Sequence, residues 1–69
     1  MTKLEEKLKE LGYKVSMTQN VDGIIIKTWL KEIDRTNFHS VQTIDGKLMC
    51  VMSDKQNEMQ KDLEEIENE

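Results

Sequence analysis

Apolar residues recur with two different periods along this chain, and the change of period separates helices from strands. Leu4, Leu8 and Leu11 lie at helical spacing and form one apolar stripe. Gly12 follows directly, and a glycine at this position commonly ends a helix in the left-handed conformation. The pattern therefore predicts a first helix over residues 2–11.

The period becomes two from Tyr13 onward. Tyr13, Val15 and Met17 alternate with polar residues, which is typical of a half-buried strand. Residues 20–23 contain the Asn, Asp and Gly of a turn, so this first strand is expected to end there.

A run of three isoleucines opens the second predicted strand, which spans residues 24–33. Ile24, Ile26 and Leu30 are expected to face the core, because they alternate with more polar positions. The outward set is then Ile25, Lys27, Trp29, Lys31 and Ile33. A short helical turn over residues 29–33 is the alternative.

The dipeptide Asp45-Gly46 is the strongest hairpin signal in the chain, and strands are predicted on either side of it, over residues 38–44 and 47–52. The pairs expected across a two-residue turn are Thr43 with Leu48, Val41 with Cys50 and His39 with Met52.

A second helix is predicted to close the chain. Ser53 and Gln56 have the spacing of a capping box, as do Thr2 and Glu5 before the first helix. The apolar stripe of this terminal helix consists of Met59, Leu63 and Ile66.

The predicted order is therefore α-β-β-β-β-α, a small α+β fold. Strands joined by short turns form an antiparallel four-stranded meander, and one helix at each terminus packs on the same face of the sheet. The opposite face is expected to meet water or a partner. With 69 residues, the chain is expected to form a single domain, 1–69.

Charge is distributed unevenly within the net −4. Residues 53–69 hold seven acids and two lysines, a net of −5, whereas residues 1–52 hold seven acids and eight basic residues, a net of +1. The start of the chain is charged rather than apolar, and no stretch approaches the roughly 20 apolar residues of a membrane span. We expect a cytoplasmic protein, and the single cysteine fits a reducing compartment.

Residues that could carry chemistry are few. The three glycines are dispersed, so no phosphate-binding loop is expected, and one histidine with one cysteine cannot supply a typical zinc site. His39 and Cys50 are predicted on one hairpin face, but a catalytic pair also needs a third group that orients the base. We interpret Cys50 as a buried, inert thiol and expect no enzyme, no cofactor and no metal.

Two surfaces remain as candidates for binding. The first is the acidic side of the terminal helix, where carboxylates recur every three to four residues: Asp54, Glu58, Asp62, Glu65 and Glu69. Their linear density approaches that of one DNA strand, at about one charge per 3.4 Å. This row predicts docking onto a larger, basic-surfaced protein, including one that normally binds nucleic acid.

The second surface is the outward face of the second strand, with Trp29 between Lys27 and Lys31. Tryptophan is enriched among binding hot spots, so this face predicts a protein contact. With Arg35 it could instead bind single-stranded nucleic acid by stacking and charge, although the acidic net charge disfavours that alternative.

The function predicted from these features is that of a non-enzymatic protein-binding module. In size and charge alone, the chain is similar to the inhibitors and adaptors that phages and mobile elements carry. A weak nucleic-acid binder is the first alternative. A self-associating unit, such as a homodimer, is the second, because a chain this short benefits from added buried surface.

Overall fold

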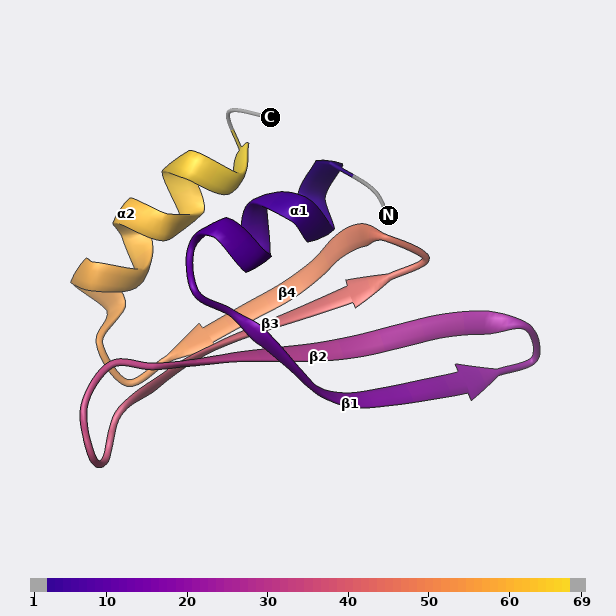
Figure 1. The fold of residues 1–69 in the computed structure, drawn as a ribbon, viewed down its shortest axis with the longest axis horizontal. Helices are drawn as coiled ribbons and strands as arrows, with labels where there is room; N and C mark the ends of the chain where they lie inside the picture. Colours follow the sequence, from indigo (N-terminus) through magenta and orange to yellow (C-terminus); the bar gives the residue numbers. More distant parts are fainter. Residues whose placement is uncertain (1–2, 68–69) are drawn as a thin grey trace.

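A computed structural model describes residues 3–67 of the chain (Figure 1). The elements are α1 (Lys3–Glu10), β1 (Lys14–Val21), β2 (Ile24–Glu32), β3 (Phe38–Ile44), β4 (Lys47–Ser53) and α2 (Gln56–Glu67). The predicted α-β-β-β-β-α order is confirmed. Thr2 of the first predicted capping box and Glu69 of the predicted acidic row lie outside the described residues.

The four strands form one antiparallel sheet in the order β1-β2-β3-β4. Two tight turns join its outer pairs, and in each an aspartate and a glycine adopt positive φ: Asp22 with Gly23, and Asp45 with Gly46. Such two-residue turns match the right-handed twist of the strands they connect. In Figure 1 both helices lie on the same side of the sheet.

The hydrophobic core lies between that sheet face and the two helices. Its buried hydrophobic members are Leu8, Tyr13, Trp29, Val41, Met59 and Ile66. Trp29 is the largest of these, and its indole N–H donates to the Thr43 hydroxyl at 3.2 Å. The core is small because the helices contribute only short apolar stripes.

The orientation predicted for β2 is wrong. Trp29 is 1% exposed and points toward the helices, and the adjacent Lys27 and Lys31 share that side of the strand because side chains alternate. The physical reason is that the helices present Glu5 and Asp62, whose carboxylates pair with the two lysine ammonium groups. The strand also ends at Glu32, so Ile33 is not part of it.

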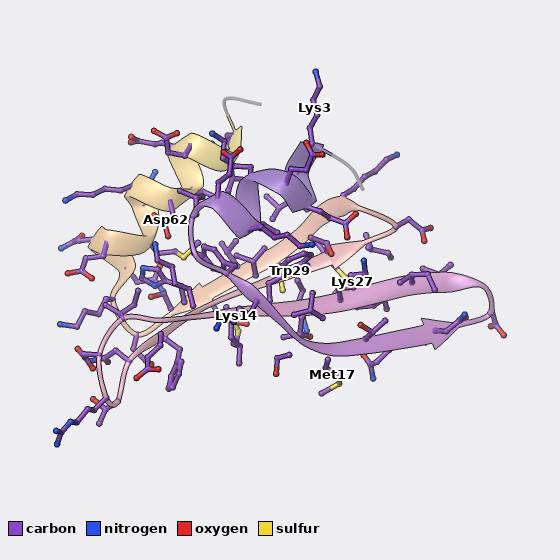
Figure 2. All side chains as sticks on the ribbon, viewed as in Figure 1. Lys3, Lys14, Met17, Lys27, Trp29 and Asp62 are labelled. Carbon is purple, nitrogen blue, oxygen red and sulfur yellow. The ribbon has the colours of Figure 1, made fainter. Side chains whose placement is uncertain are left out.

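β1 is exposed along its whole length, so the prediction of a half-buried strand is wrong. The buried residues of the sheet belong to β2 and β3, and Tyr13 is the buried anchor just before β1 begins. An irregularity in the pairing between Val15 and Met17 shifts the register by one residue. Met17 consequently lies on the side of β1 away from the helices (Figure 2).

A second irregularity changes the β3–β4 hairpin. Thr43 lies opposite Leu48 as predicted, but the remaining predicted pairs are shifted by one residue. The observed pairs are Gln42 with Cys50, Val41 with Val51 and His39 with Ser53. His39 is therefore buried under the helices, whereas Cys50 lies on the opposite face, exposed. The prediction of a buried thiol is wrong, and the two residues do not share a face.

The second helix also begins differently from the predicted capping box. The Ser53 hydroxyl accepts from the Lys55 N–H at 2.9 Å, and the Gln56 side chain donates to the Ser53 carbonyl oxygen at 2.8 Å. The first turn is closed by bonds from Glu58 and Met59 to the Lys55 carbonyl. Ser53 is the last residue of β4, so its hydrogen bonds stabilise the connection between the strand and the helix. The helix itself begins at Gln56.

Candidate functional site

The Trp29 face proposed from the sequence is the interior of the protein. Figure 2 shows Trp29 between the sheet and the helix layer. On one side of it Lys27 Nζ lies 2.6 Å from Glu5 Oε2, and on the other Lys31 Nζ lies 2.9 Å from Asp62 Oδ2. These two ion pairs attach α1 and α2 to the same strand. The cations expected to bind a partner are therefore engaged inside the fold.

Asp62 is the centre of a second small network. The Tyr13 hydroxyl donates to Asp62 Oδ2 at 2.9 Å, and the Lys31 ammonium lies 5.5 Å from the centre of the Tyr13 ring. Burial raises the pKa of the Tyr13 phenol, and the hydrogen bond to Asp62 and its negative charge raise that pKa further. Asp62 thus joins β2, Tyr13 and α2 rather than facing solvent.

The predicted acidic row is consequently interrupted. Asp54, Glu58 and Glu65 are exposed, with Glu65 Oε2 3.7 Å from Lys7 Nζ, while the Asp62 side chain is only 13% exposed. Arg35, the remaining cation of the nucleic-acid hypothesis, is exposed in the loop between β2 and β3, away from the buried Trp29.

That loop is ordered by Asp34. Its carboxylate accepts hydrogen bonds from the backbone N–H groups of Thr36 and Asn37, each at 3.0 Å, and from the Asn37 amide. The Thr36 bond, followed by the Asn37 side chain, holds the pKa of Asp34 below its ordinary value. These hydrogen bonds fix the conformation of the loop directly before β3, which begins at Phe38.

The opposite face of the sheet is left uncovered by the described elements, and we call it the open face. Cross-strand partners share a face, so its members follow from the register: Ile26 lies opposite Ile44, and Leu30 lies opposite Ser40, which in turn lies opposite Met52. Its large apolar residues are Met17, Val21, Ile24, Ile26, Leu30, Phe38, Ile44 and Met52. Met52 is 66% exposed and Met17 is 53% exposed, although both are apolar.

A polar row crosses the middle of the open face. The Gln42 amide donates to the Thr28 hydroxyl at 3.5 Å, and the Cys50 thiol donates to the Gln42 carbonyl oxygen at 2.9 Å. These three side chains come from three adjacent strands and partner one another. The row divides the apolar residues into a group near the two tight turns and a group near Phe38.

Charged residues of the open face are confined to strand ends. Lys14 begins β1, Glu32 ends β2 and Lys47 begins β4, and all three are exposed. Charged residues make up 35% of the chain, so their scarcity between these ends marks the face as different from the rest of the surface. Residues 15–21 and 48–53 contain no charged residue, a signal that the sequence displays and that could have pointed to this face.

The segment 3–67 contains no group of three or more His, Cys, Asp and Glu side chains placed to hold a metal ion. No helix in it has the length and apolar character needed to cross a membrane. Comparison of the chain with protein-family models, with curated proteins and with solved structures found no match.

Proposed function

We propose that this chain is a non-enzymatic protein-binding module that docks through the open face. The observation that carries this proposal is the large uncovered apolar surface made by four adjacent strands, with charges only at the strand ends. Apolar patches of this extent on small domains commonly mark interaction sites, because their hydration is unfavourable. A partner that covers the open face would remove this surface from water.

The exposed apolar side chains of the open face are suited to such docking. Ile24, Phe38 and Met52 are all more than a third exposed, so each has apolar area left to bury. Complete burial of side chains of this size is worth roughly 1.5–3 kcal/mol each, and partly exposed ones contribute a fraction of that. The partner surface that fits is apolar, with polar groups only near the row formed by Thr28, Gln42 and Cys50.

Docking of the α2 carboxylates onto a basic protein is the second candidate. It is supported by the exposure of Glu58, Glu64, Glu65 and Glu67, in a helix with acids rather than bases in its last turn. Carboxylates at that end oppose the helix dipole, so their presence is not explained by helix stability. The Asp62 side chain points inward and pairs with Lys31, so the row of exposed carboxylates on α2 is interrupted in its middle. This interruption weakens the second candidate.

Two charge-introducing substitutions distinguish these candidates. Ile26→Lys places a cation in the apolar group of the open face near the two tight turns, and Glu58→Lys places one on the exposed side of α2. We expect the tagged wild-type chain to capture a protein from extracts of its native host, even at high salt. Ile26→Lys should abolish that capture, while Glu58→Lys should preserve it.

Met52→Lys serves as a second open-face variant, since its exposure makes misfolding less of a concern than at Ile26 on an inner strand. Circular dichroism and the fluorescence of the single tryptophan, Trp29, report whether each variant is folded. Capture that survives both open-face substitutions but is lost with Glu58→Lys or with salt would refute the open face and favour the acidic helix.

A further inference from the structure

We infer that the protein occupying the open face is a second copy of this chain, docked sheet to sheet about a two-fold axis. This inference rests on the proposed function and names its partner. Two-fold homodimers are the commonest oligomers, and their interface uses the same patch on both subunits. An uncovered sheet face can meet that requirement, because two twisted sheets stack about 10 Å apart with interdigitated side chains.

The size of the open face favours an occupant with the same dimensions. Four strands of seven to nine residues give it an outline of about 19 Å by 27 Å, or roughly 500 Å² per copy. Two such faces therefore bury about 1,000 Å² of surface in total, without the additional area of projecting side chains. This total is near the lower limit for a stable interface. A partner that covered only part of the face would bury less area than that limit, whereas a second sheet of the same dimensions covers the whole face.

The charge distribution permits this docking and opposes the alternative through the helices. Residues 56–67 contain five acids and one lysine, a net of −4, and they lie on the side of the sheet away from the open face. A sheet-to-sheet dimer has four layers with the two α2 helices outermost, so the helices lie three interlayer spacings apart, about 30 Å. That distance is several times the Debye length of about 8 Å at physiological ionic strength, so their repulsion is screened.

The polar row lowers the desolvation cost of burying the face. Thr28, Gln42 and Cys50 hydrogen-bond to one another within one chain. A buried polar group without a partner costs roughly 1–3 kcal/mol, and these intramolecular bonds avoid part of that cost. The remaining hydrogen-bonding capacity of the Gln42 amide is available to the same row of the second copy.

Cys50 provides a native probe of the inferred interface, because it is the only cysteine, is exposed in the single chain and lies on the open face. We would measure the molar mass by sedimentation equilibrium and the rate of thiol modification by a disulfide reagent over about a hundredfold range of protein concentration. The expected result is a dimer at the higher concentrations, with Cys50 modification slowed at least tenfold. Met52→Lys should return the chain to a monomer with a fast-reacting thiol, and Glu58→Lys should leave the dimer and its protection intact.

The other outcomes overturn the inference in different ways. A monomer at every concentration would refute self-docking. The proposed function would then be tested by the capture of another protein: loss of capture with Ile26→Lys would support it, and unchanged capture would refute it. A dimer in which Cys50 reacts at the monomer rate would place the interface at the edge of β1 or on the helices. If open-face substitutions alter neither self-association nor capture, both proposals are wrong.

Discussion

Thr43 supplies the hydrogen-bond acceptor for the indole of Trp29 inside the core. Both side chains are about 1% exposed, and the bond between Nε1 and Oγ1 is 3.2 Å long. Thr43→Val keeps the size and branching of the side chain but removes the acceptor, so the indole N–H is left buried without a partner. We expect a loss of about 1–3 kcal/mol in the free energy of unfolding, measured by urea denaturation.

Thr43→Ser is the matched control, since it retains the hydroxyl and removes one methyl group. It should cost less than Thr43→Val if the hydrogen bond matters more than the methyl contact. A larger loss of stability for Thr43→Ser than for Thr43→Val would show that water reaches the indole N–H. The surroundings of Trp29 would then be more hydrated than its burial indicates.

Lysine is the residue that misleads a pattern-based prediction of this fold. Its long aliphatic stem packs like an apolar side chain while its ammonium group needs water or a carboxylate. Lys27 and Lys31 flank Trp29 on the covered face, and each reaches an acid on a different helix. The alternation of β2 was predictable from its residues, but its inward direction depends on Glu5 and Asp62, which are distant in the chain.

Among the elements, α2 depends on a contact whose strength should vary with pH. Burial and Asp62 raise the pKa of Tyr13 above the ordinary value near 10, so the folded chain keeps this phenol protonated where the unfolded chain has lost the proton. The stabilisation is fully present below about pH 10 and is lost as pH rises further. The free energy of unfolding should then fall by up to about 1.4 kcal/mol per pH unit from this group.

Tyr13→Phe isolates that contribution, because the two proteins differ only in the phenolic hydroxyl group. The variant should lose about 1 kcal/mol near neutral pH, when the bond to Asp62 is removed. Its stability should decline less steeply than that of the wild type between pH 9 and 11, as measured by urea unfolding followed by fluorescence. Parallel declines would mean that Tyr13 titrates alike in the folded and unfolded chains.

Most element boundaries were predictable from turn chemistry, whereas the faces of the edge strands were not. Aspartate–glycine pairs and Gly12 mark three boundaries in the sequence, and the structure places elements on either side of each. The irregularities near Ser16 and Met49 have no comparable mark, and each shifts the register by one residue. Because side chains alternate with a period of two, such a shift moves the following residues to the other face. The charge-free stretches 15–21 and 48–53 point to these two edge strands, but which of their residues share the open face follows only from the observed pairing.

For the molecule as a whole, the small core makes stability sensitive to single truncations. A chain of this length has a total stability near the lower end of the usual range, about 3–5 kcal/mol. Leu8 is completely buried between α1 and the sheet, and replacing a buried leucine by alanine costs about 2–5 kcal/mol. We expect Leu8→Ala to populate the unfolded state at 25 °C without denaturant, as seen by circular dichroism and in urea titrations.

Leu63→Ala makes the same chemical change on the other helix, where the side chain is only partly buried. It should cost about 1 kcal/mol and leave the chain folded, because less apolar area and less cavity volume are involved. Equal losses at the two positions would contradict the observed core. A negligible loss at Leu8 would mean that α1 contributes little to the stability of the sheet, and the layer of helices opposite the open face would then be held mainly by α2 and its bond network around Asp62.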